Sequence, residues 1–142
     1  MIFNQRWPVW ISTARPLPFN HIPIKKMPIK RIVPNIESAT PRRSIEFYER
    51  FLGLKTAMDM GWIITFISED NPTSQVSVIR NKSSAAPHPD LSIEVEDVDQ
   101  MFAKAKEQHI EVVYPITDEP WGVRRFFVQD PNGKVINILS HL

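Results

Sequence analysis

The sequence predicts an α+β fold made of two tandem units, at about residues 30–80 and 90–142. Three observations lead to this prediction. Each unit reads in the order strand, helix and three strands, a polar linker with prolines at residues 81–89 separates the two, and glycine- or proline-containing turns separate the strands. With 142 residues, of which 42% are hydrophobic, the chain is large enough for one domain with its own core.

The first 28 residues are expected to form an irregular N-terminal extension, outside the domain that we place at residues 29–142. They contain five of the 13 prolines and neither a glycine nor an acidic residue, and such a composition disrupts helices and sheet ladders. Three interpretations stay open for this segment: an organellar transit peptide, sequence that precedes a natural start at Met27, and an arm that packs on a partner subunit.

The first unit opens with a short apolar strand at residues 31–36, where Pro34 indicates an edge or irregular position. Thr40 is expected to cap the helix that follows, and Pro41 suits its first position. Apolar residues at three- and four-residue spacing give this helix one buried face, and Gly53 ends it. Strands are predicted at residues 55–58, 62–67 and 75–79.

The second unit repeats this order. A strand with alternating polarity is predicted at residues 91–95, and Asp97 is expected to cap an amphipathic helix, with Gln100 completing a capping box. Strands follow at residues 111–114, 123–128 and 135–139. The last two form a hairpin around Asp-Pro-Asn-Gly at residues 130–133, since proline and Asn-Gly favour a tight turn.

Composition excludes several kinds of protein. Without cysteine the chain has no disulfide, zinc–thiolate site or cysteine nucleophile, and we expect it to work in the cytoplasm. No apolar run reaches the length of about 18 residues that a membrane helix needs. The net charge is +1, but the chain after residue 31 carries 11 basic and 16 acidic residues, a net charge of −5. This acidic body argues against a nucleic-acid partner, which needs a clustered basic face.

Two stretches carry a family resemblance. The matching residues stand in the first helix and in the final hairpin, and they are Ser44, Phe47, Tyr48, Leu52, Gly53 and Leu54, then Trp121, Gly122, Arg124, Asp130, Pro131, Asn132 and Gly133. In this order and spacing the chain resembles the vicinal-oxygen-chelate superfamily of glyoxalase I, bleomycin-resistance proteins, fosfomycin-resistance enzymes and extradiol dioxygenases.

The resemblance implies that two βαβββ units form a cup-shaped mixed sheet, with helices on its convex side and a cavity between the units. It also implies a homodimer, because many members dimerise. From the pattern of elements alone, a ferredoxin-like α+β sandwich is the alternative.

Metal-using members of the superfamily place a divalent metal on the inner wall of the cup, held by two histidines and a glutamate. Carried to this sequence, the first position has no histidine in residues 31–36, the second falls on Asp90 and the third on Asn137. We therefore expect no bound metal and no other cofactor. The alternative is a metal-dependent lyase or dioxygenase with a degraded or misaligned site, for which Glu37, His88 and His141 are the remaining candidates.

Polar and aromatic residues on the predicted inner face suggest a small-molecule site. Ser92 and Glu94 alternate with apolar residues, so they lie opposite the helix-packed face, and Asn137 interrupts an apolar strand. Trp62 and Trp121 open equivalent strands of the two units, where aromatic rings can line a pocket.

Only one of Arg124 and Arg125 can point inward, because neighbouring residues of a strand face opposite sides, and the family motif contains Arg124.

From these polar and aromatic residues we predict a protein that binds or sequesters an organic ligand. The resemblance places it nearest to the metal-free bleomycin-resistance branch, with Glu94, Glu119 and Trp62 as acidic and stacking contacts. The predicted ligand-binding residues are Trp62, Asp90, Ser92, Glu94, Trp121, Arg124 and Asn137.

Overall fold

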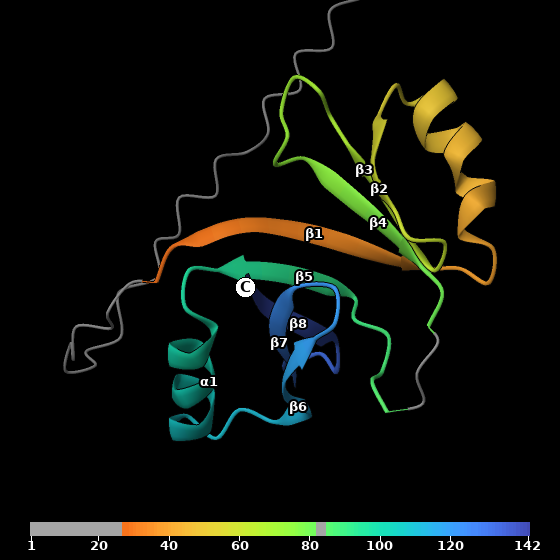
Figure 1. Ribbon diagram of the computed structural model, residues 1–142. Coiled ribbons are helices and arrows are strands. Elements are labelled where there is room, and N and C mark those ends of the chain that lie inside the picture. The colour runs from red at the N-terminus through yellow and green to blue at the C-terminus, as the bar shows by residue number, and fades with distance from the viewer. Residues whose placement is uncertain (1–26, 82–84) are drawn as a thin grey trace, which may run out of the picture.

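The computed structural model describes residues 27–81 and 85–142. The predictions for residues 1–26 lie outside this range. Eight strands form one mixed sheet in the order β2-β3-β4-β1-β5-β8-β7-β6. This is the predicted α+β fold of two tandem βαβββ units, each of which contributes four neighbouring strands (Figure 1). None of the described helices is long and apolar enough to cross a membrane.

The first unit contains four strands that agree closely with the prediction. Gln75–Ile79 has the predicted bounds, and the others differ by one to two residues at an end. The strands are β1 (Ile29–Glu37), β2 (Lys55–Asp59), β3 (Ile63–Ile67) and β4 (Gln75–Ile79).

The helical segment of this unit is not one regular α-helix. It consists of a 3₁₀ turn, η1 (Pro41–Ser44), and a π-helical segment, η2 (Glu46–Phe51). Pro41 stands at the first position as predicted, but the side chain of Thr40 makes no capping hydrogen bond, so that prediction was wrong. Gly53 ends the segment with a φ of 74°, which glycine adopts without strain.

The second unit contains β5 (Leu91–Val95), β6 (Val112–Glu119), β7 (Val123–Gln129) and β8 (Val135–His141). Its helix, α1 (Val98–Glu107), is a regular α-helix that begins at Asp97, whose carboxylate accepts a hydrogen bond from the Gln100 amide as predicted. The turn between β7 and β8 also forms as predicted. There the backbone N–H of Lys134 donates to the Asp130 carboxylate and, with the amides of Asn132, lowers the pKa of Asp130.

The two units join edge to edge through β1 and β5, which pair antiparallel in the middle of the sheet (Figure 1). Pro34 was predicted to mark an edge or irregular position, and β1 is a central strand. Proline fits there because β4 pairs only with Asn35–Glu37 of β1, so Pro34 has a neighbouring strand on the β5 side alone. A missing N–H group is tolerated at such a one-sided position.

Each unit packs its helical segment against the convex side of its own strands. In the first unit the buried core is Ile64, Phe66 and Val78, covered by residues that include Ile45 and Tyr48. In the second unit the core is Val95, Val98, Ala105, Phe126 and Ile138. Because side chains alternate along a strand, the neighbours of these core residues in sequence point to the concave side of the sheet.

Candidate ligand-binding cavity

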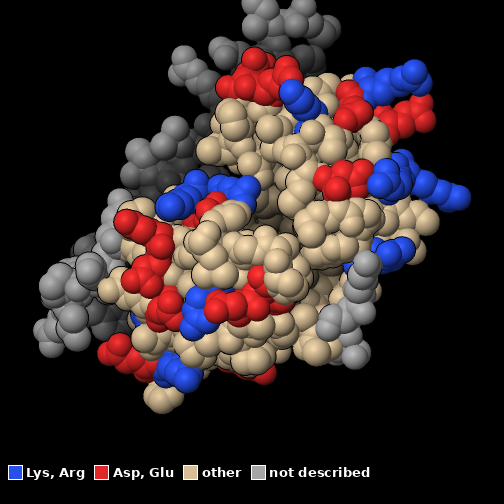
Figure 2. Space-filling model, viewed as in Figure 1, with Lys and Arg blue, Asp and Glu red and all other residues tan. Residues whose placement is uncertain are grey.

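The concave side of the sheet encloses a cavity of about 630 Å³ that both units line. The first unit contributes aliphatic side chains, such as Met58 and Ile63, together with polar residues and two arginines. The second contributes more aromatic rings and the charged side chains of Arg125 and Glu119. Figure 2 shows acidic and basic side chains interspersed over the face that it presents, without a continuous basic stripe. The cavity is large enough for a small organic molecule.

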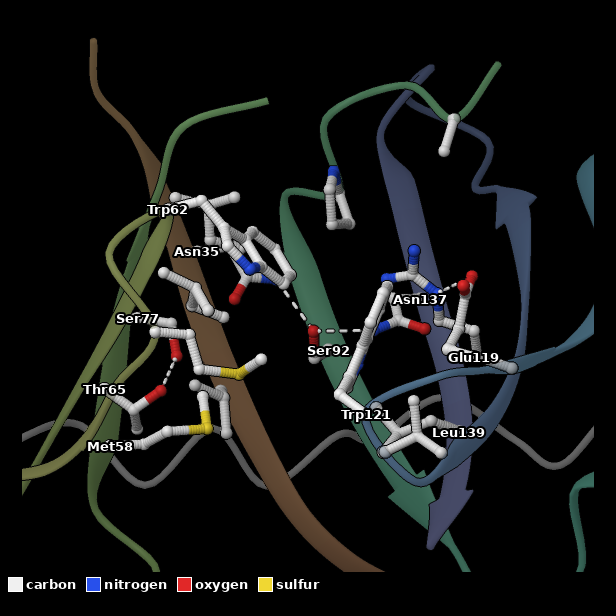
Figure 3. A pocket seen from close by; sticks show the side chains of 18 of the residues that line it. Asn35, Met58, Trp62, Thr65, Ser77, Ser92, Glu119, Trp121, Asn137 and Leu139 are labelled. Carbon is white, nitrogen blue, oxygen red and sulfur yellow. Dashed lines mark hydrogen bonds and ion pairs between the residues drawn. The ribbon is translucent and has the colours of Figure 1, made fainter. Parts of the chain in front are cut away.

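Three polar side chains meet at the floor of the cavity, where the two units join (Figure 3). The amide nitrogens of Asn35 and Asn137 both donate to the hydroxyl oxygen of Ser92, at 2.8 and 3.0 Å. Asn35 is 9% and Asn137 6% exposed. The Oδ1 atom of Asn137 is buried and has no hydrogen-bond partner among the described residues.

A second polar pair lies on the wall of the first unit. The hydroxyls of Thr65 and Ser77 are 2.7 Å apart and hydrogen bond to each other, and both residues are buried (Figure 3). Each of these two hydroxyls has the other as its hydrogen-bond partner, whereas the buried Oδ1 of Asn137 has none among the described residues.

Two tryptophans, one from each unit, meet across the cavity. Trp62 precedes β3 and Trp121 precedes β7, and their rings lie 5.2 Å apart between centroids with an angle of 63° between planes (Figure 3). Trp121 is 37% exposed, so one side of this pair faces solvent. An edge-to-face pair of this kind offers ring faces to a planar ligand.

The wall of the second unit is organised around Arg125. Its guanidinium makes an ion pair with Glu119 at 2.9 Å and lies over the rings of Tyr114, Trp121 and Phe127, at 4.8 to 5.4 Å from the centroids. The Tyr114 hydroxyl donates to the same Glu119 carboxylate at 2.8 Å. The charges of Arg125 and Glu119 therefore neutralise each other, and the ion pair fixes the aromatic wall.

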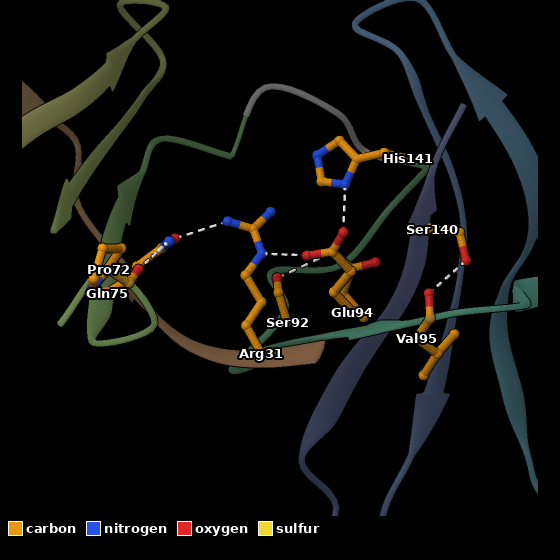
Figure 4. A network of polar contacts seen from close by, with 9 residues as sticks. Arg31, Pro72, Gln75, Ser92, Glu94, Val95, Ser140 and His141 are labelled. Atoms are coloured by element: carbon orange, nitrogen blue, oxygen red, sulfur yellow. Dashed lines mark hydrogen bonds and ion pairs between the residues drawn. The ribbon is translucent and has the colours of Figure 1, made fainter. Parts of the chain in front are cut away.

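Beside the cavity, Glu94 holds two residues that line it. Its carboxylate pairs with Arg31 at 2.6 Å and with the Nδ1 of His141 at 2.7 Å, and Arg31 also donates to Gln75 (Figure 4). Burial raises the pKa of Glu94, but the His141 hydrogen bond and the charge of Arg31 outweigh it, so the pKa is lowered overall. Glu94 therefore positions the lining residues and is not itself one of them.

The structure brings four of the seven predicted ligand-binding residues together. Trp62, Ser92, Trp121 and Asn137 line the cavity, and their contact with a ligand stays a prediction. Asp90, Glu94 and Arg124 are not among the lining residues.

The reasons differ for the three residues outside the lining. The Asp90 carboxylate accepts a hydrogen bond from the Val135 amide, which places it at the start of β5, two residues before the floor. Glu94 is engaged as described above. Arg124 was the predicted inward arginine, but it lies on the convex side with Asp99 and Asp118. Hydrogen bonds to Asp99 and Asp118 raise its pKa.

Several cavity residues were not predicted from the sequence. Asn35 and Ser77 are polar residues inside apolar strands, the same signal that identified Asn137, and that signal could have found both. The face of Arg125 could have been inferred from Phe126, because a phenylalanine that packs under α1 leaves its neighbours Arg125 and Phe127 on the concave side. His88, one of the candidate ligands in the metal-dependent alternative, is half-buried with its Nε2 3.2 Å from the Asn35 carbonyl oxygen.

The residues at the floor do not fit the metal that the family resemblance implies. The first and last strands of each unit bring Asn35, Ser77, Ser92 and Asn137 to the concave side, and these offer only amide and hydroxyl groups. First-row divalent metals are held in proteins chiefly by imidazole, carboxylate and thiolate. No group of three or more His, Cys, Asp or Glu side chains suited to a metal ion occurs in residues 27–81 and 85–142.

Comparisons with known proteins agree with this architecture. A family profile described as a glyoxalase-like domain matches residues 30–142. No curated protein matches the chain. Among similar solved structures, an NAD-dependent benzaldehyde dehydrogenase from Legionella pneumophila is 18% identical, with a TM-score of 0.65 over 78% of this chain and 99% of that chain.

A methylmalonyl-CoA epimerase from Streptomyces coelicolor is 16% identical, with a TM-score of 0.62 over 80% of this chain and 99% of that chain. A glyoxalase/bleomycin resistance protein/dioxygenase superfamily member from Vibrio splendidus 12B01 is 12% identical, with a TM-score of 0.59 over 81% and 99%. At these identities the similarity establishes the fold.

Proposed function

This chain belongs to the glyoxalase-like domain family, and we propose that it binds a small organic ligand with a planar aromatic part in the cavity between its two units. The observation that carries the proposal is the tryptophan pair, one ring from each unit, beside a cavity of about 630 Å³ with a polar floor. Pockets for organic ligands combine apolar and aromatic walls with a few placed polar groups in this way.

The proposal includes binding without a catalytic metal, as in the bleomycin-resistance branch of the superfamily. Its support is the chemistry of the floor, where amides and a hydroxyl replace the imidazole and carboxylate groups that such a metal needs. Metal-dependent lyase or dioxygenase chemistry is the alternative, and it would need ligands that the described residues do not bring together.

We also propose that the protein acts as a homodimer in the cytoplasm, with neither a nucleic acid nor a membrane as partner. Sedimentation equilibrium of the full chain tests the dimer. A mass near twice the 16.5 kDa of one chain is expected, and a monomer at all concentrations would contradict it.

The main test is a binding experiment on the full chain with Trp7 and Trp10 changed to phenylalanine, so that only Trp62 and Trp121 fluoresce. Fused-ring aromatic compounds should quench this fluorescence saturably. Calorimetric affinity for the best compound should fall about three- to tenfold in Trp62→Ala and in Trp121→Ala, since an aromatic contact contributes about 0.5–1.5 kcal/mol.

Phe51→Ala is the control, because Phe51 is 74% exposed on η2 and is not a lining residue. It should leave the affinity unchanged. Absence of saturable binding, or binding that neither tryptophan affects, would rule the proposal out.

A further inference from the structure

We propose that the floor cluster, defined as Asn35, Ser92 and Asn137, is a hydrogen-bonding subsite for an uncharged polar group of the ligand, of the amide or carboxamide class. This inference rests on the proposed function, because it names the chemistry of a ligand in the same cavity. It differs from the prediction of acidic contacts to a cationic ligand, in which Glu94 and Glu119 would take part.

The first observation is an unused hydrogen-bonding atom at the floor. Asn137 is 6% exposed and lines the cavity, yet its Oδ1 has no partner among the described residues. Rotating the amide by half a turn would let Oδ1 accept from the Ser92 hydroxyl, but Nδ2 would then be the unused atom. A buried polar atom without a partner costs about 1–3 kcal/mol, so a ligand that supplies the partner gains that amount.

The second observation is the hydroxyl of Ser92. Its oxygen accepts from both Asn35 and Asn137, so its own hydrogen is not used by either bond. The floor therefore offers a hydroxyl donor and an amide acceptor close to each other. A carboxamide matches this pair, because its carbonyl oxygen accepts while its N–H donates.

The third observation is the absence of an available charge at the floor. Among the described lining residues the only carboxylate is Glu119, which is held by Arg125 and Tyr114. Glu94, outside the lining, is held by Arg31 and His141. The lining cations also lie away from the floor cluster: Arg31 and Arg125 are held in ion pairs, and Arg80 is exposed just beyond the end of β4. At the floor itself a cationic head group would meet no free carboxylate, and an anionic one would lose its hydration against amide and hydroxyl groups. Burying an unpaired charge is costly, so an uncharged group is preferred.

The test uses four compounds that share a naphthalene ring and differ in one substituent: a carboxamide, a carboxylate, a carboxamidine and a methyl group. Their affinities for the full chain are measured by calorimetry. The carboxamide should bind about tenfold more tightly than the methyl compound, because it satisfies the unused atoms. It should also bind more tightly than the anionic carboxylate and the cationic carboxamidine.

Two variants of Asn137 test whether the preference for the carboxamide arises at the floor cluster. Asn137→Leu should remove the advantage of the carboxamide over the methyl compound, while the methyl compound keeps its affinity. Asn137→Asp puts a carboxylate at the floor and should move the preference to the carboxamidine. A gain of binding of this kind does not follow from loss of structure.

Thr65→Val is the matched control, because its hydroxyl is on the cavity wall but is used by Ser77. It should keep the ranking of the four compounds. If either Asn137 variant melts below the assay temperature, the relative affinities of the unmodified chain for the four compounds still test the preference for the carboxamide.

Equal affinity for all four compounds would overturn the inference and leave the proposed function standing. A preference for a charged compound in the unmodified chain would also overturn it. Absence of binding by every compound, the methyl one included, would count against the proposed function itself.

Discussion

The two units of this protein share one strand topology but differ in their helices and in what they bring to the cavity. The first unit covers its sheet with a 3₁₀ turn and a π-helical segment, and the second uses one capped α-helix. On the concave side, the first unit buries a pair of hydroxyls, Thr65 and Ser77, that hydrogen bond to each other, whereas the second presents the Arg125–Glu119 ion pair among aromatic rings.

This difference makes the cavity asymmetric. Toward the first unit a ligand meets side chains such as Met58, Ile63 and Ile67, and toward the second it meets Tyr114 and Trp121 around a neutralised charge pair. The floor where β1 and β5 join is the polar point between the two walls. A repeated topology therefore does not imply a symmetric site, because each unit fills the same positions with different chemistry.

The largest expected effects come from the two cores. Phe126→Ala in the second unit and Phe66→Ala in the first should each destabilise the protein by about 3–5 kcal/mol, since both rings are fully buried. Because β1 and β5 join the units in one sheet, each variant should shift a single urea unfolding transition. Two separate transitions would show that the units unfold independently.

A smaller loss is expected where a charge pair holds the second wall. Arg125→Met should cost about 3 kcal/mol, because it leaves Glu119, whose side chain is 9% exposed, without its cation. Arg124→Met, the neighbour on the convex face, should cost much less, since Asp99 and Asp118 remain hydrated. Urea denaturation of both variants measures the difference, and equal losses would contradict this assignment of faces.

The two helix starts should respond differently to removal of their capping residues. Asp97→Ala should destabilise the protein by about 1 kcal/mol, because it removes the acceptor for the Gln100 amide. Thr40→Ala should change stability little, since the Thr40 side chain makes no capping bond. Thermal unfolding of the two variants gives the comparison, and a larger loss for Thr40→Ala would disprove it.

The smallest effect concerns the acid sensitivity of Glu94. The pKa of Glu94 is lowered in the folded protein. The stability that this carboxylate adds to the fold is therefore fully present above the usual glutamate pKa and is lost as the pH falls through the lowered pKa. Glu94→Gln should therefore flatten the fall in melting temperature between neutral and acid pH. Glu69→Gln, which removes an exposed partner of Lys55, is the control. An unchanged acid profile in Glu94→Gln would refute the argument.

Most strands, and their order along the chain, could be predicted because turn residues and alternating polarity fix them locally. The exception is β6, which was predicted at residues 111–114 but runs from Val112 to Glu119. The bounds of β4 and β5 agree with the prediction at both ends. The geometry of the first helix could not be predicted in this way. Its apolar spacing suits an α-helix with one buried face. In the structure Ile45 and Tyr48 pack on the sheet, but Phe47 and Phe51 remain exposed, and the segment from Glu46 to Phe51 is π-helical.

The site was predictable where one residue differed from its neighbours, as with Asn137 and the two tryptophans. It was missed where the answer depended on pairing across the sheet. Asp90 and Ser92 have the same parity and were both predicted, but only Ser92 reaches the floor, because the Asp90 carboxylate lies at the start of β5 and accepts from the Val135 amide. The choice of Arg124 over Arg125 followed the family motif and not the alternation with Phe126, which packs under α1 and leaves Arg125 on the concave side.

The most direct test of metal-free binding compares the affinity for naphthalene carboxamide in two preparations of the full chain. One is treated with a chelator, and the other is dialysed against nickel, zinc, manganese and iron salts. We expect the same dissociation constant in both, with binding that weakens in Asn137→Leu. Binding that requires one tightly held metal ion per chain would contradict the account and assign the cavity to metal-dependent chemistry.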